Sequence, residues 1–169
     1  MFDKFGEFDS WEEINRAAAA QRKEGDDKAL YVLAEENGIE REEAEDYLAG
    51  EMEGLVTPLT AALGKLQVEA GELEPYEIMG DWLEYIRMRC MELNAMALAV
   101  RSRDKSLKGC IAALLTWSFK NAKPVDKDIL NQANVSGQVS LGIPGMGRAR
   151  QIITSYYLDG KEGSRDAGI

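Results

Sequence analysis

Helix start and stop signals recur through the first fifty residues and restrict the fold more than any other feature of the chain. Ser10 and Glu13 form a capping box, in which each side chain accepts a hydrogen bond from the backbone amide of the other residue. Glycine reaches the left-handed conformation at low cost and therefore commonly follows a helix. Helices that end just before a glycine are predicted at 11–24, 27–37 and 40–49. The pattern indicates a compact bundle of three short helices.

Apolar residues keep recurring at three- and four-residue spacing through most of the remaining chain, as expected for helices that bury one face. This spacing predicts further helices at 51–70, 76–93, 95–100, 107–120, 126–133 and 148–158. Pro58 interrupts the first of these, so a kinked helix and two abutting helices both remain open. Only in 135–141 do apolar and polar residues alternate, as they do in a strand with one buried face. We therefore expect an all-α protein with at most one short strand or hairpin near 135–143.

The helix predicted at 107–120 is apolar over most of its circumference, which is typical of a helix surrounded by its neighbours. We expect it to be the core helix of the second half, with four large side chains inside: Ile111, Leu114, Leu115 and Phe119. Trp117 and the Tyr156–Tyr157 pair also have apolar neighbours at helical spacing, so core packing is favoured over stacking on nucleic-acid bases.

Charge divides the chain into two unlike parts. Residues 1–81 hold 7 lysines and arginines against 22 aspartates and glutamates, a net −15, whereas 82–169 hold 13 against 8, a net +5. The change falls near Gly71–Pro75, the best candidate for a linker. We expect two small packed helical subdomains, an acidic one at 1–72 and a basic one at 75–160. The residues 161–169 have no apolar period and are expected to be a frayed tail.

The composition argues against ordinary enzyme chemistry. The chain has no histidine, which removes Ser-His and Cys-His nucleophiles, histidine metal ligands and the commonest general base. Its two cysteines, Cys90 and Cys110, cannot build a zinc site or a disulfide framework. We expect no catalytic residue, cofactor or metal site, and no small-molecule substrate. Without an apolar run long enough to span a membrane or a secretion signal, a cytoplasmic protein is expected.

The densest acidic cluster lies at 35–53 and is the first candidate for binding a partner. It is read either as a solvated outer face or as a surface that imitates nucleic-acid phosphates and binds a basic protein. Its nine carboxylates are Glu35, Glu36, Glu40, Glu42, Glu43, Glu45, Asp46, Glu51 and Glu53.

Two basic features in the second half are candidates for contact with nucleic acid. The first is a cluster in a turn and the following helical turn, where cations oppose the helix dipole unless an anion is bound: Arg101, Arg103, Lys105 and Lys108. The second resembles the glycine loop of a helix-hairpin-helix module, although the preceding helix ends too early for one: Gly145, Gly147, Arg148 and Arg150. A solvated turn and a Pro-Gly turn before an ordinary helix are the competing interpretations.

Several blocks of the second half, in order and spacing, resemble the PcfK-like family carried on conjugative elements. The blocks are 81–90 (DWLEYIRMRC), 96–99 (MALA), 105–110 (KSLKGC), 125–129 (VDKDI) and the tyrosine pair at 156–157. Thr154 and Ser155 stand ahead of that pair, where the family has a histidine. Members of this family, and similar small acidic proteins of mobile elements, include inhibitors of the type II CRISPR nuclease.

The resemblance implies a non-enzymatic protein of a mobile genetic element, an anti-CRISPR inhibitor that binds the nuclease loaded with its guide RNA and blocks either DNA binding or DNA cleavage. Such a nuclease holds its RNA–DNA heteroduplex in a positively charged channel, which an acidic DNA mimic fits. The alternative is a nucleic-acid-binding accessory protein of a conjugative element that uses the basic half. Binding to DNA that weakens steeply with salt would favour this alternative.

Overall fold

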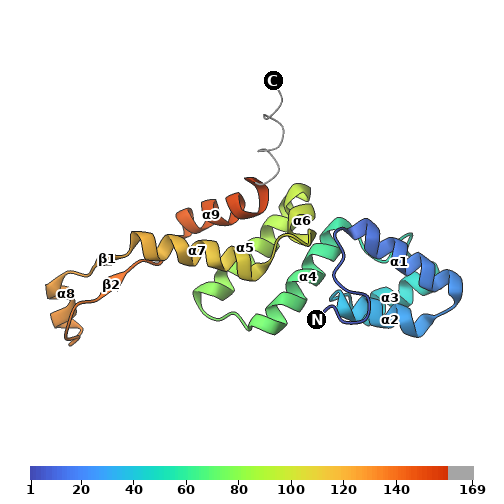
Figure 1. The fold of residues 1–169 in the computed structure, drawn as a ribbon, viewed down its shortest axis with the longest axis horizontal. Coiled ribbons are helices and arrows are strands. Elements are labelled where there is room, and N and C mark those ends of the chain that lie inside the picture. The colour runs from blue at the N-terminus through green and yellow to red at the C-terminus, as the bar shows by residue number, and fades with distance from the viewer. Residues whose placement is uncertain (160–169) are drawn as a thin grey trace, which may run out of the picture.

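Nine helices and one short hairpin make up residues 1–159, the part of the chain that this computed structural model describes (Figure 1). The helices are α1 (Trp11–Glu24), α2 (Asp27–Glu36), α3 (Arg41–Ala49), α4 (Pro58–Leu73), α5 (Ile78–Glu92), α6 (Asn94–Arg101), α7 (Leu107–Asn121), α8 (Lys127–Gln132) and α9 (Met146–Leu158). The strands β1 (Lys123–Pro124) and β2 (Ser140–Leu141) pair antiparallel, with Lys123 opposite Leu141. The predicted all-α class with a short hairpin is confirmed. The predicted frayed tail lies outside the described residues.

The first three helices form the N-terminal bundle, and their ends follow the predicted signals. The hydroxyl of Ser10 accepts a hydrogen bond from the Glu13 amide at the start of α1. The Glu13 carboxylate accepts from the amide of Asp9 at 2.8 Å and not from that of Ser10, so the second half of the predicted capping box is wrong. Gly25 and Gly50 adopt left-handed backbone angles directly after α1 and α3, where a side chain would be strained. The bundle buries a small apolar core that includes Ile14, Leu30, Leu33, Tyr47 and Leu55.

The ambiguous stretch before α4 is not helical. Thr57 caps α4 and Pro58 is its first residue, a position where the missing amide costs nothing. The residues before it run past α1, because Asn15 forms two hydrogen bonds with the backbone of Val56, donating to its carbonyl at 2.8 Å and accepting from its amide at 2.9 Å. These bonds hold the backbone of Val56 in a non-helical conformation beside α1.

Helix α4 contributes to both apolar cores, so the two subdomains meet along it. Ala61 packs in the core of the N-terminal bundle, whereas Ala62 and Leu66 belong to a second core built with α5, α6, α7 and α9. The segment Gly71–Pro75, which the sequence favoured as the linker, is therefore not a boundary, since Gly71 to Leu73 form the last turn of α4 and α4 is already part of the second core. The central residues of that core are Trp82, Leu83, Ile86, Met96, Val100, Leu107, Leu114, Ile153 and Tyr157.

The end of α2 and the middle of α4 approach each other through two glycines. A Cβ added at Gly38, whose φ is +67°, would lie 2.1 Å from the carbonyl oxygen of Gly64. A Cβ at Gly64 would lie 2.2 Å from the carbonyl oxygen of Asn37. Neither glycine tolerates a side chain without moving one helix away from the other.

The second half of α7 leaves the body of the protein and carries the hairpin and α8 outward (Figure 1). Leu114 is fully buried, but Leu115 is 53% exposed and Phe119 is 79% exposed. Burial of the last two was predicted and is wrong, because within residues 1–159 no element packs on the face of α7 that carries Leu115 and Phe119. We call residues 115–143 the arm. It lies at the end of the molecule opposite the N-terminal bundle.

Candidate interaction surfaces and a buried polar junction

Six of the nine carboxylates predicted to bind a partner are exposed on the N-terminal bundle, and two more are partly exposed. They lie on α2, on α3 and on the segment that follows α3. We call these eight residues the acidic surface: Glu35, Glu40, Glu42, Glu43, Glu45, Asp46, Glu51 and Glu53. Among the described cations, Arg41 alone forms an ion pair with them, from its Nε to Glu45 at 3.0 Å. The surface is therefore strongly negative.

Three of the eight carboxylates already have a structural role within α3. Glu40 and Glu43 form a reciprocal capping box at its start, and Glu45 pairs with Arg41 one turn away. Arg41 also lies over the ring of Tyr31, with its guanidinium carbon 4.3 Å from the ring centroid. The carboxylates that remain exposed with no such role are Glu35, Glu42, Glu51 and Glu53.

Glu36, the ninth carboxylate, is buried, and its assignment to partner binding is corrected here. Its carboxylate accepts hydrogen bonds from the backbone amides of Lys4 and Phe5, the latter at 3.0 Å. Glu36 therefore fastens the N-terminal segment to α2. Glu36 lies one helical turn after the buried Leu33 and so on the same face of α2. This spacing was the signal in the sequence that could have predicted burial of Glu36 and exposure of Glu35.

Arg101, the first residue of the predicted basic cluster, is also unavailable to a nucleic acid, because it is only 1% exposed. Its Nη2 donates to Asn37 Oδ1 at 3.2 Å, while its Nε and Nη1 have no partner among the described residues. The guanidinium carbon lies 5.7 Å from the centroid of the Phe2 ring. Burial lowers the pKa of Arg101, although the nearby carboxylates Glu7 and Glu69 act in the opposite direction.

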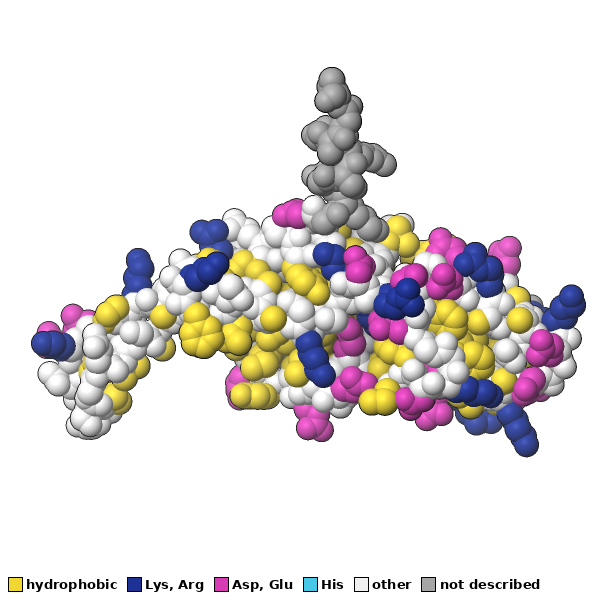
Figure 2. All heavy atoms as spheres, in the orientation of Figure 1, with side chains coloured by type: hydrophobic (Ala, Val, Ile, Leu, Met, Phe, Trp, Pro, Cys, Tyr) yellow, Lys and Arg dark blue, Asp and Glu magenta, His cyan; other side chains and the backbone are white. Residues whose placement is uncertain are grey.

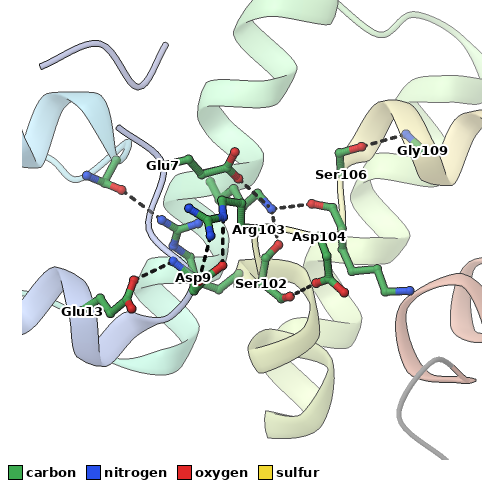
Figure 3. Close-up of polar contacts among 12 residues, drawn as sticks. Glu7, Asp9, Glu13, Ser102, Arg103, Asp104, Ser106 and Gly109 are labelled. Carbon is green, nitrogen blue, oxygen red and sulfur yellow. Dashed lines mark hydrogen bonds and ion pairs between the residues drawn. The ribbon is translucent and has the colours of Figure 1, made fainter. Parts of the chain in front are cut away.

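The rest of the basic cluster is divided among different contacts. Arg103 pairs with Asp9 of the N-terminal segment through two nitrogen–oxygen contacts of 3.1 Å (Figure 3). The ammonium of Lys105 lies 5.0 Å from the centroid of the Tyr156 ring, and Lys108 is exposed. Arg103, Lys105 and Lys108 nevertheless line one pocket. Glu7, Glu69 and Glu72 line the same pocket, so it carries carboxylates as well as cations.

Lys65 lies at the centre of a buried polar junction between the N-terminal segment, α4 and the turn from α6 to α7. Its ammonium donates to the carbonyl oxygens of Ser102, at 2.6 Å, and Lys105, and pairs with Glu7 Oε1 at 3.2 Å. Figure 3 shows Glu7 and Ser102 on either side of this contact. Burial lowers the pKa of Lys65, opposed by Glu69 and Glu7. Since all three protons are engaged, Lys65 acts as a structural cation.

Glu69 lies one helical turn after Lys65 and completes the junction. Its Oε2 is buried without a hydrogen-bond partner in the described part of the chain, and burial raises the pKa of this carboxyl, opposed mainly by Lys65. Sequence reasoning missed both residues. The available signal was a Lys–Glu pair at i,i+4 spacing directly beside the apolar stripe of α4.

The glycine loop leads into α9 as a turn and not as part of a helix-hairpin-helix. Gly145 is the N-cap of α9, and the residues 133–145, which include β2, separate this helix from α8. Arg148 and Arg150 extend over aromatic rings, with guanidinium carbons 5.9 Å from the Trp117 centroid and 5.4 Å from the Tyr85 centroid. The loop residue Gly147 is exposed, and its backbone amide lies in the first turn of α9.

Both cysteines are buried in the second core, and their thiols are free. Burial raises the pKa of Cys90 and of Cys110 to about 12. Since the thiolate is the reactive form, neither cysteine can act as a nucleophile near neutral pH in the folded protein.

Comparison with known proteins gives no match: no family model, no curated protein and no solved structure is similar to the chain. Within residues 1–159, no three histidine, cysteine, aspartate or glutamate side chains are grouped as metal ligands would be. In the same range, no helix has the length and apolar character needed to cross a lipid bilayer.

Proposed function

We propose that this chain is a non-enzymatic inhibitor that binds an RNA-guided CRISPR nuclease of type II through its acidic surface and competes with DNA. The observation that carries the proposal is the density of exposed carboxylates on α2, α3 and the following segment, with Arg41 as their one ion-paired cation among the described residues. The nucleic-acid channel of such a nuclease is lined with positive charge, and its short DNA signal is read by arginines. An acidic helical surface is complementary to both.

Several ion pairs must act together for this surface to bind tightly. At an effective dielectric near 20, a carboxylate about 4 Å from an arginine gains up to ~4 kcal/mol before desolvation, but exposed pairs retain only ~0.2–1 kcal/mol. The four carboxylates without a structural role, Glu35, Glu42, Glu51 and Glu53, are therefore expected to contribute as a group. The proposal places the partner's arginines and lysines opposite this group.

The architecture supports a binding protein more than an enzyme. Lys65 is fully buried in the junction, and the thiols of Cys90 and Cys110 lie inside the second core. These groups with shifted pKa values stabilise the fold. Glu69 is only partly buried and also lines the pocket beside Lys105 and Lys108.

A competition experiment tests the proposal. A purified type II nuclease with guide RNA is mixed with fluorescent target DNA, and DNA binding is followed by anisotropy as this protein is added. We expect the DNA to be displaced, and the displacement to weaken as salt is raised. The proposal is contradicted if the protein leaves DNA binding unchanged, or forms no complex with any of a panel of type II nucleases.

A second candidate function is a nucleic-acid-binding accessory protein, favoured by exposed cations on the C-terminal half. Lys108 at the start of α7 and three lysines of the arm, Lys120, Lys123 and Lys127, are all exposed. Direct titration of the protein into labelled DNA separates the two functions, because phosphate contacts release counterions and weaken steeply with salt. DNA binding that is lost when these lysines are changed to glutamine would favour this alternative.

A further inference from the structure

The arm exposes large apolar side chains that the rest of the described chain leaves uncovered. From residue 115 to residue 143, no side chain reaches the buried class. Six large apolar residues of this segment are 42–79% exposed: Leu115, Phe119, Ile129, Val135, Leu141 and Ile143. Figure 2 shows hydrophobic side chains distributed over the arm at the end of the molecule away from the N-terminal bundle.

Hydrogen bonds and close packing within the arm nevertheless define its conformation. The amide of Val125 donates to the carbonyl of Val139 at 2.8 Å and extends the pairing of β1 with β2. The Asp126 carboxylate accepts from the amide of Asp128 and caps α8. Gly142 lies so close to α7 that an added Cβ would be 2.2 Å from the carbonyl oxygen of Ser118. These contacts hold the apolar residues in fixed positions on a protruding element.

The exposed apolar area of the arm matches what a stable interface needs. At about 150–250 Å² for a large side chain, the six exposed fractions amount to roughly 700 Å². The largest apolar patch of a typical monomer is about 300–600 Å², and a standard interface buries about 800 Å² on each partner. Summed over all its sides, the apolar surface of the arm therefore exceeds the largest patch of a typical monomer and comes close to one side of a standard interface.

The N-terminal bundle offers no counterpart to this surface. Outside the arm, only five other large apolar residues of the described chain are exposed above one third: Met1, Tyr76, Met88, Met91 and Met146. None of them lies on α1, α2 or α3. In a second copy of the chain, the extended apolar surface that can cover an arm is thus the other arm.

We infer that two copies of this chain associate arm against arm, as a dimer with two-fold symmetry. An interface of this kind uses the same patch on both copies and closes at two subunits. The charges of the arm are compatible with the pairing, since it carries Lys120, Lys123 and Lys127 together with Asp126 and Asp128. An antiparallel arrangement sets lysines of one copy beside aspartates of the other. The two acidic surfaces then lie at the far ends of the dimer.

The mass of the full-length protein in solution tests this inference. Light scattering after size-exclusion chromatography is expected to give about 37 kDa, twice the 18.7 kDa of one chain, at concentrations up to about 100 μM. Because the contact is mainly apolar, the dimer is expected to persist in about 1 M salt, where exposed ion pairs are screened. A monomeric mass at all these concentrations would overturn the inference.

A pair of variants locates the interface. Leu115→Lys combined with Phe119→Glu replaces two exposed apolar residues on one face of α7 without changing net charge, and we expect a monomer. Met88→Lys combined with Met91→Glu makes the matched change on α5 and is expected to remain a dimer. Dissociation of the control alone, or of neither variant, would place the interface elsewhere and refute the arm pairing.

A folding control and a replacement variant guard against loss of the dimer through misfolding. Circular dichroism must show the same helical signal for the variants as for the wild type, and Ile129→Glu on α8 replaces the α7 variant if that protein does not fold. Ile129 is 59% exposed and its change is also expected to give a monomer. Assemblies larger than a dimer that dissociate in salt would indicate a head-to-tail contact between arm and acidic surface, which contradicts the inference.

Discussion

Arg101 of α6 donates a hydrogen bond from its Nη2 to Oδ1 of Asn37 at the end of α2, 3.2 Å away, and both residues are buried. The contact crosses 64 positions of the sequence and joins the N-terminal bundle to the second core. Asn37 in turn donates from Nδ2 to the carbonyl of Leu33 at 2.9 Å. One buried polar pair thus fixes the acidic part of the molecule against the rest.

Replacing Arg101 by alanine is expected to lower the free energy of unfolding by about 2–4 kcal/mol, because Asn37 loses a buried partner and a cavity opens. Arg103→Ala is the matched control, since Arg103 pairs with Asp9 at the surface, where an ion pair contributes less than ~1 kcal/mol. Urea unfolding followed by circular dichroism measures both variants. Equal effects would show that Arg101 does not join the two parts.

The close approach of α2 and α4 predicts an asymmetry among glycines. Gly38→Ala and Gly64→Ala are each expected to destabilise the protein by more than about 2 kcal/mol, since the added Cβ would overlap a backbone carbonyl. Gly71→Ala, in the last turn of α4 with open space around it, is expected to stabilise by about 0.5–1 kcal/mol. Thermal unfolding of the three variants measures the order of their stabilities. A destabilised Gly71→Ala together with a Gly64→Ala as stable as the wild type would contradict the close approach of α2 and α4.

The sequence predicted the capped helices accurately because their signals are local. Ser10, Gly25 and Gly50 act through bonds and backbone angles within a few residues of themselves, so their effect does not depend on the rest of the fold. The start of α4 stayed ambiguous, since Pro58 allows either a kink or a first turn. The deciding contact comes from Asn15, which lies 41 positions from Val56.

Burial could not be predicted where it depends on distant partners. Leu114 and Leu115 are consecutive apolar residues of the same type in α7, but only the first lies against other helices. Glu35 and Glu36 are neighbours of the same type, and only the amides of the N-terminal segment distinguish them. A local sequence pattern predicts which residues are suited to burial or to binding. The tertiary fold determines which of them are buried and which remain exposed to a partner.

The buried junction predicts a pH effect specific to Glu69. Because burial raises the pKa of this carboxyl above its ordinary 4.5 in the folded protein, folding takes up a proton between the unfolded and folded pKa values. Lowering the pH through that window therefore stabilises the wild type relative to Glu69→Gln. The difference in unfolding free energy, wild type minus variant, is expected to increase from about pH 7 to about pH 5. A difference that is constant or shrinks would show that Glu69 is not buried as described.

The thiols offer a direct check on the second core. Since burial raises the pKa of Cys90 and Cys110 to about 12, a colourless disulfide reagent at about pH 8 is expected to react slowly with the native protein and at once with the unfolded chain. Ser136→Cys, on the exposed arm, provides a fast-reacting control. Native cysteines that react as fast as this control would contradict the packing of α5 and α7.

The central claim is that the acidic surface binds the nuclease, and reversal of its charge tests it most directly. The variant changes Glu35, Glu42, Glu51 and Glu53 to lysine, which leaves the capping box of α3 intact. The control changes four exposed carboxylates of the C-terminal part to lysine and so alters net charge equally: Glu74, Glu77, Asp81 and Glu84. Circular dichroism confirms that both remain helical.

The measurement is the dissociation constant of each protein for the type II nuclease loaded with guide RNA, at fixed ionic strength. We expect the reversed acidic surface to weaken binding on the order of 100-fold, because four favourable pairs become repulsive, and the control to stay within about threefold of the wild type. If the control loses as much affinity as the variant, or the variant binds like the wild type, the acidic surface is not the binding site.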